Sequence, residues 1–225
     1  TIGMIINFHD LMAFFHVVLF VYAIGGDIAV YFIGNYITRE ELTIEERLRV
    51  RSMRFLVDMS ARTSLVLLLP IGFTLATTFG SEIKGAALII IWLFSIVWLG
   101  LIWMVHFKKE TVIGELLRKL DLLIRYILSL LLIALGIFCL TTNSIIQSDW
   151  LSWKIIIFGL ILVNGIWIRA IVGRMRKSIT LAQESDTKIE GEKSIKKDQA
   201  VLNKAALLIW VLVILMAFLG ELKPL

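Results

Sequence analysis

The sequence predicts an all-α fold: a polytopic membrane bundle of six transmembrane helices, in a single integral membrane domain that covers residues 1–225. Of the 225 residues, 59% are hydrophobic, whereas soluble domains contain about 45–50% apolar residues. Apolar runs of about 20 residues recur along the chain, and each is long enough to cross a bilayer core of roughly 30 Å. A membrane β-barrel would instead show short segments of alternating hydrophobicity.

Each expected span has its own boundary signal. Thr43 and Glu46 have capping-box spacing, so a short surface helix is expected ahead of the second span. Gly80 and Gly85 enclose the turn before the third. Polar turns or basic stretches separate the others, and Lys154 lies between tryptophans and the apolar part of the fifth. The spans cover residues 11–35, 55–79, 86–106, 122–140, 150–172 and 205–222.

The stretch 174–204 is basic and polar and has no hydrophobic period, which predicts a mobile cytoplasmic loop. The basic residues of the chain lie in alternate connections, after the first, third and fifth spans, and the even connections carry only Lys84. By the positive-inside rule, the odd connections face the cytoplasm and both termini face outside, in the periplasm. This asymmetry accounts for the net charge of +5, so we expect a multi-pass protein of the cell inner membrane that contacts lipid and no nucleic acid.

Charged side chains inside apolar segments are the main candidates for function, because they are costly in a bilayer. Arg54, Asp58 and Arg62 are spaced four residues apart, on one face of the second span. Asp27 in the first span lies at the level of Arg62, so we expect these two to form a buried ion pair that Asp58 and Arg54 share. The set is either a structural network or a path for protons or anions.

His16 lies ten residues before Gly26 in the first span. It is either a haem or metal ligand or a histidine that is hydrogen-bonded inside the bundle. Three further segments place polar residues within or beside apolar runs. They are Arg51-Ser-Met-Arg54 leading through Arg62 to Pro70-Ile-Gly-Phe-Thr-Leu, Trp150-Leu-Ser-Trp-Lys154, and Asn203 through Lys223-Pro224-Leu225.

Over residues 7–80 and 148–225, this arrangement resembles the HemJ membrane protoporphyrinogen oxidases and the related CopD copper-resistance domain. The resemblance implies haem b, a tetrapyrrole substrate, His16 as a ligand, and Lys154 and Arg62 as groups that orient acids. Relative to that family, the third and fourth spans are an insertion, and a family histidine is replaced by Asn164. The family's Asn-Glu-X-Pro opening of the last span reads Asn203-Lys204-Ala205-Ala206.

Depth limits how a haem could be held. His9 and His16 are seven residues apart on one helix, about 10 Å, and His106 is expected at the opposite membrane face. Neither can share an iron with His16 within one subunit, so a second ligand would be Lys154, Asn164, a methionine, water or a residue of another chain.

Three functions are therefore expected from different classes. The first is a haem- or metal-linked redox or tetrapyrrole role, that of a membrane oxidoreductase, with no other cofactor. The second is a non-catalytic accessory subunit of a larger membrane complex, or of a homo-oligomer. The third is a small proton-coupled transporter that uses Asp27.

Overall fold

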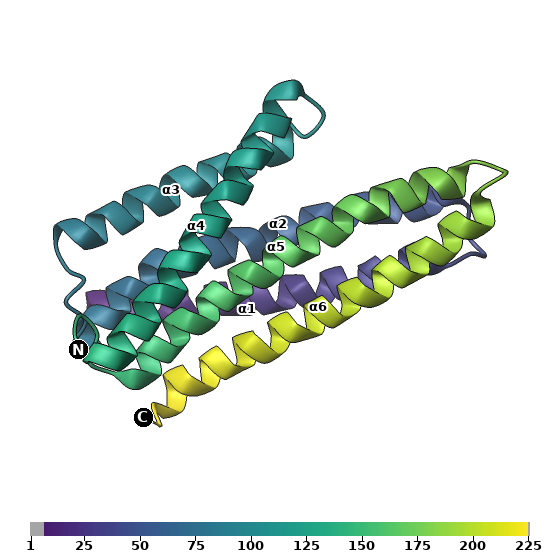
Figure 1. The fold of residues 1–225 in the computed structure, drawn as a ribbon. Helices are drawn as coiled ribbons and strands as arrows, with labels where there is room; N and C mark the ends of the chain where they lie inside the picture. Colours follow the sequence, from purple (N-terminus) through teal and green to yellow (C-terminus); the bar gives the residue numbers. More distant parts are fainter. Residues whose placement is uncertain (1–6, 225) are drawn as a thin grey trace, which may run out of the picture.

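A computed structural model describes residues 7–224, and these residues form six long α-helices and two short 3₁₀ helices, with no strand (Figure 1). All six long helices are long and apolar enough to cross a membrane. The expected six-helix, all-α architecture is confirmed. The elements are α1 (Phe8–Gly34), η1 (Asn35–Thr38), α2 (Ile44–Ala76), η2 (Thr77–Phe79), α3 (Ala86–Phe107), α4 (Val112–Thr142), α5 (Asp149–Gln183) and α6 (Lys188–Leu222).

The helices alternate in direction, so the connections gather at two ends. We call the end that holds both termini and the connections 80–85 and 143–148 the terminal end. The other end, with the connections 39–43, 108–111 and 184–187, is the basic end. Figure 1 shows α5 and α6 running side by side to a turn at the basic end, and α3 diverging from α4 after their shared turn.

The prediction of a loop at residues 174–204 is wrong. The structure continues α5 to Gln183 and begins α6 at Lys188, leaving a four-residue turn. We call residues 173–204 the hairpin extension. Apolar side chains at helical spacing hold it together, and the buried cluster consists of Ile37, Ile171, Met175, Ile179, Ala182, Ile195 and Leu202. Burial of this seam supplies the hydrophobic contacts that stabilise helices outside an apolar span.

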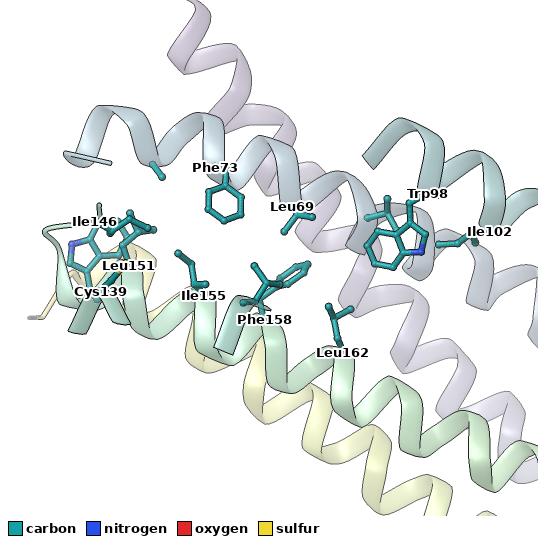
Figure 2. Packing of buried hydrophobic residues seen from close by; sticks show 14 of the residues in the cluster. Leu69, Phe73, Trp98, Ile102, Cys139, Ile146, Leu151, Ile155, Phe158 and Leu162 are labelled. Carbon is teal, nitrogen blue, oxygen red and sulfur yellow. The ribbon is translucent and has the colours of Figure 1, made fainter. Parts of the chain in front are cut away.

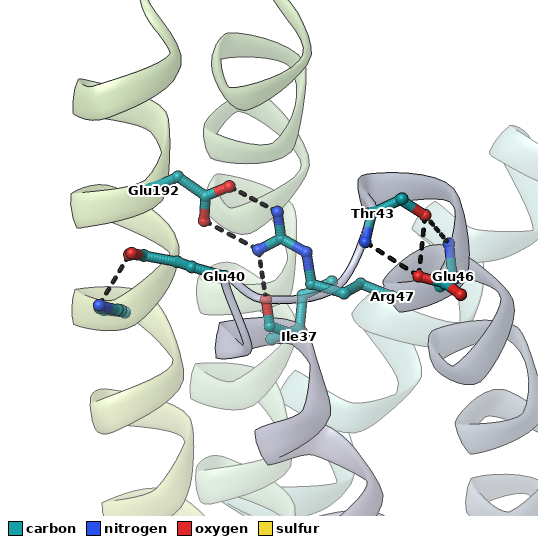
Figure 3. A network of polar contacts seen from close by, with 7 residues as sticks. Ile37, Glu40, Thr43, Glu46, Arg47 and Glu192 are labelled. Atoms are coloured by element: carbon teal, nitrogen blue, oxygen red, sulfur yellow. Dashed lines mark hydrogen bonds and ion pairs between the residues drawn. The ribbon is translucent and has the colours of Figure 1, made fainter.

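The start of α2 also packs on the hairpin extension. Thr43 caps α2 with the expected capping box, in which Thr43 Oγ1 accepts from Glu46 N at 3.3 Å and Thr43 N donates to Glu46 Oε2 at 3.0 Å. The helix then runs without a break into the second span, so it is not a separate surface helix. One turn in, Arg47 is buried and bonds both carboxylate oxygens of Glu192 on α6 (Figure 3).

Close approach at glycines fixes the helix pairs of the bundle. A Cβ atom on Gly26 of α1 would lie 2.9 Å from Ser60 Oγ and 3.2 Å from Ala61 N on α2. A Cβ atom on Gly159 of α5 would lie 3.1 Å from the backbone oxygen of Ser129 on α4. Small residues of this kind let membrane helices pack backbone to backbone.

The main hydrophobic core lies between α2, α3, α4 and α5. In Figure 2, Leu69 and Phe73 of α2 point toward Ile155 and Phe158 of α5. Trp98 of α3 is 1% exposed and belongs to the same cluster. This core leaves α1 and α6 to close the remaining side of the bundle, where the cavity described next is found.

Candidate functional site

A cavity of about 800 Å³ lies at the terminal end, between α1, α2, α5 and α6. Its wall is mainly apolar, with side chains such as Leu69, Phe73, Ile155 and Phe158. Volumes of about 300–1,000 Å³ with a few polar groups in an apolar wall are typical of small-molecule and cofactor sites. The cavity therefore has the size and the character of a site for a large apolar ligand.

His16 contributes a polar group to the wall of this cavity. Its Nδ1 atom is buried and has no hydrogen-bond partner among the described residues. The ring faces Gly72 of α2, where an added Cβ atom would lie 3.8 Å from His16 Cε1. The alternative expectation, a histidine that is hydrogen-bonded inside the bundle, is not what residues 7–224 show at Nδ1.

Two lysines contribute positive charge to the wall of the cavity. Lys154 of α5 is half-buried, with Nζ 5.9 Å from the centre of the Trp150 ring. Lys223, just after α6, places Nζ 4.4 Å from the centre of the Phe79 ring. An added Cβ atom on Gly220 would lie only 2.6 Å from Lys154 Nζ, so this glycine makes room for the lysine. Lys154 was expected in the site, whereas Lys223 was not.

Two other residues that the sequence assigned to the cofactor do not line the cavity. Asn164 is 4% exposed and donates from Nδ2 to the backbone oxygen of Ala205 at 2.8 Å, which ties α5 to α6. Arg62 lies nearer the basic end, where Nη2 is 2.5 Å from Asp58 Oδ2. Within the described residues, no group of three or more histidines, cysteines or acids is placed to hold a metal ion.

The expected contact between Asp58 and Arg62 within α2 is confirmed, whereas the expected ion pair between Asp27 and Arg62 is absent from the described residues. The two partners Asp58 and Arg62 are one helical turn apart, and this spacing lets a short carboxylate reach the guanidinium without a neighbouring helix. In residues 7–224, no nitrogen of Arg62 lies within 4.0 Å of an Asp27 oxygen. Arg54 forms no ion pair there either, and one of its terminal nitrogens lies near Gly34 of α1.

A second ionised cluster, on α3, α4 and α5, was not predicted. Asp121 is 1% exposed; its Oδ1 accepts from Trp98 Nε1 at 2.8 Å and its Oδ2 is 2.5 Å from Arg169 Nη2. Arg125, one turn along α4, bonds the same carboxylate through Nε at 3.3 Å. The signal was available in the sequence, because Asp121 and Arg125 are four residues apart and Arg169 is an arginine within an expected span.

Comparisons with protein-family models, with curated proteins and with solved structures found no match to this chain. The fold and the two sites define its class: a six-helix bundle of the membrane type. It has an apolar cavity at the terminal end and buried ion pairs toward the basic end.

Proposed function

We propose that this chain is an integral inner-membrane protein that binds haem b in the terminal-end cavity and uses it in a redox or tetrapyrrole reaction. The observation that carries the proposal is His16, whose buried Nδ1 has no described partner and which lines a cavity of about 800 Å³. The resemblance to the HemJ and CopD proteins gives the same residue as a ligand. A single buried histidine in an apolar pocket is also a common way to hold a haem iron.

The residues of the cavity fit such a group. Gly72 leaves open the space in front of the His16 ring, and the apolar wall suits a large flat ring system. Lys154 and Lys223 would face the two acidic groups that a haem carries, because ammonium groups bind carboxylates through charge-assisted hydrogen bonds. Bound haem would supply one-electron chemistry, and its potential would be set by the axial ligands and the polarity of the pocket.

Residues of the chain would control the access of water to the ligand and the orientation of its acidic groups. His16 would hold the group to α1, and the apolar side chains of α2 and α5 would exclude water from it. Lys154 and Lys223 would orient an acidic ligand with its charges toward the terminal end. Asn164 and Arg62 would act on the bundle and not on the ligand, because they line no part of this cavity.

The proposed orientation places the basic end in the cytoplasm and both termini in the periplasm, on the charge asymmetry of the connections. The cavity would then open toward the outer half of the membrane. A reporter fused after residue 224 should read as periplasmic, and one in the turn 184–187 as cytoplasmic. The opposite reading at either position would reject the orientation.

The visible spectrum of the purified protein tests the proposed function. The wild type should show a Soret band, and His16→Ala should lose it. His106→Ala is the matched control, because His106 ends α3 at the basic end and lines no part of the cavity. A colourless wild type that takes up no added haem would reject the cofactor and favour an accessory subunit of a membrane complex. Retention of the band in His16→Ala would reject the ligand assignment.

A further inference from the structure

Three arginines from three helices lie together toward the basic end, about 22 Å along α5 from Lys154, as estimated from the rise per residue. They are Arg62 of α2, Arg125 of α4 and Arg169 of α5. Arg125 and Arg169 share the carboxylate of Asp121, and α2, which carries Arg62, is in contact with α5. No Cα atom of α2 comes within 8 Å of a Cα atom of α4 in the described chain. The backbones of α2 and α4 are therefore separated, and α5 packs against both.

The carboxylates near these arginines do not balance their charge. Asp58 pairs with Arg62, and Asp121 pairs with both Arg125 and Arg169, which leaves three positive charges against two negative ones. An uncompensated charge inside an apolar bundle is expensive, so the cluster favours a further negative group.

The hydrogen-bond donors of Arg125 also favour a further negative group at the cluster. The residue is 4% exposed, and its only hydrogen bonds to described residues leave from Nε, to the two oxygens of Asp121. The four N–H groups on its Nη1 and Nη2 therefore have no partner in residues 7–224. The guanidinium carbon lies 5.3 Å from the centre of the Trp98 ring, and Nη1 is 4.0 Å from where a Cβ atom of Gly165 would be.

We propose that Arg62, Arg125 and Arg169 bind a phosphate-type oxyanion between α2, α4 and α5. Arginine is suited to this ligand, because its planar fork of N–H donors matches the oxygens of a phosphate group. The oxygens of one phosphate group can accept hydrogen bonds from more than one guanidinium. A carboxylate has only two oxygens, so it can join fewer arginines. Asp121 holds Arg125 through Nε and Arg169 through Nη2, and Asp58 holds Arg62 through Nη2.

The position of the cluster suggests two sources for the phosphate. Asp121 and Arg169 lie within a few residues of the expected ends of their spans at the basic end, which is the level of lipid headgroups. Basic pockets between membrane helices at that level bind anionic lipid headgroups. The other source is free phosphate. The cluster is separate from the cavity, so its failure as a phosphate site would leave the haem proposal untouched.

The test compares Arg125→Gln with Lys119→Gln in delipidated protein in detergent. Both changes remove one positive charge from the same part of α4, but Lys119 is exposed and makes no ion pair with a described residue. The thermal midpoint is measured with added phosphatidylglycerol, phosphatidylcholine or inorganic phosphate. Native mass spectrometry of the wild type measures which of these the protein retains.

If a lipid headgroup binds, phosphatidylglycerol at a hundredfold excess over its Kd should raise the midpoint of the wild type and of Lys119→Gln by about 5–10 °C. Arg125→Gln should bind about tenfold more weakly, the loss expected for charge-assisted hydrogen bonds. If inorganic phosphate gives the same pattern, the site takes the free anion. The proposal is overturned if neither compound stabilises or is retained by the wild type, or if Arg125→Gln responds as Lys119→Gln does. If Arg125→Gln does not fold, the thermal midpoint and the native mass spectrum of the wild type decide whether phosphatidylglycerol or phosphate binds.

Discussion

Arg47 and Glu192 are 145 residues apart in the chain, yet Arg47 Nη1 lies 2.8 Å from Glu192 Oε2 and Nη2 lies 2.5 Å from Oε1. Arg47 Nη1 also donates to the backbone oxygen of Ile37 at 3.1 Å. One guanidinium thus joins η1, the first turn of α2 and the first turns of α6 (Figure 3). Both residues lie outside the expected spans.

Breaking this pair should destabilise the protein strongly. Because either partner alone leaves a buried charge without compensation, we expect Arg47→Ala or Glu192→Ala to lower the free energy of unfolding by about 3 kcal/mol. The double variant should recover part of the loss. Lys196→Ala is the control, since Lys196 and its partner Glu40 are half-exposed and such pairs contribute under about 1 kcal/mol. Thermal unfolding in detergent measures all four; equal losses in Arg47→Ala and Lys196→Ala would contradict the pairing.

The same pair predicts acid sensitivity. The hydrogen bonds from Arg47 hold the pKa of Glu192 below its ordinary value. A carboxyl whose pKa is lower in the folded state stabilises that state above the unfolded pKa, and the contribution is lost as the pH falls through the folded value. The thermal midpoint of the wild type should therefore decrease once the pH is below about 4.3, the ordinary pKa of glutamate. Glu192→Gln should remove that part of the decline, and an identical pH profile in both proteins would contradict the prediction.

Adjacent glycines in α1 should respond differently to the same substitution. Gly26 packs against the backbone of Ala61, whereas an added Cβ on Gly25 would have no atom within 4 Å. We expect Gly26→Leu to lower the free energy of unfolding by about 1–3 kcal/mol through overpacking. Gly25→Leu should be neutral or slightly stabilising, because leucine favours helices more than glycine does. Thermal unfolding of the two variants checks this, and a larger loss at Gly25 would mean that the other face of α1 contacts α2.

Filling the cavity should prevent ligand binding without unfolding the protein. An added Cβ at Gly72 meets His16 only at an ordinary contact distance, so Gly72→Ala should fold and retain the Soret band. Gly72→Phe should place a ring in front of His16 and lose the band. Gly100→Phe is the control, because Gly100 is exposed on α3 with open space beside it. Visible spectra and thermal midpoints of the three variants are the measurements, and a normal band in Gly72→Phe would place the haem elsewhere.

Asp121 should be more important for stability than Glu115, the other acid of α4. It neutralises two arginines and accepts a bond from Trp98 while buried. Asp121→Asn should cost about 3 kcal/mol, the loss typical when one partner of a buried pair is removed. Glu115→Gln on the same helix is exposed and should change stability by less than about 0.5 kcal/mol. Similar unfolding midpoints for the two variants would show that Asp121 is not the centre of the cluster.

The sequence predicted the six helices because long apolar runs have few alternatives in a bilayer. It did not predict where α5 and α6 end at the basic end, since hydropathy measures only the apolar part of a helix. The spacing of Ile171, Met175 and Ile179 carried the missing signal, but a short polar-rich amphipathic seam is hard to distinguish from a loop before its partner is known.

The candidate sites were predicted unevenly. Isolated polar residues in a span, such as His16 and Lys154, can be selected from the sequence by residue type alone. The structure places both at the cavity. Pairing depends on which helices are neighbours and on side-chain reach. Depth alone suggested Asp27 for Arg62, but Asp58 on the same helix reaches it first. The spacing of Asp121 and Arg125 could be read from the sequence, but the contact of Asp121 with Arg169 depends on the packing of α5 on α4, which no local pattern encodes.

The length of α5 has a mechanical consequence. The helix is unbroken over 35 residues, or about 52 Å, and contains no proline. It carries Lys154 at the cavity and Ser178 in the hairpin extension, and its close approaches to α4 lie between Ser152 and Gly159. Lys154 lies within that contact, whereas Ser178 is about 29 Å beyond Gly159 along the helix axis. A tilt of α5 about that contact would therefore displace the hairpin extension and leave the cavity wall nearly in place.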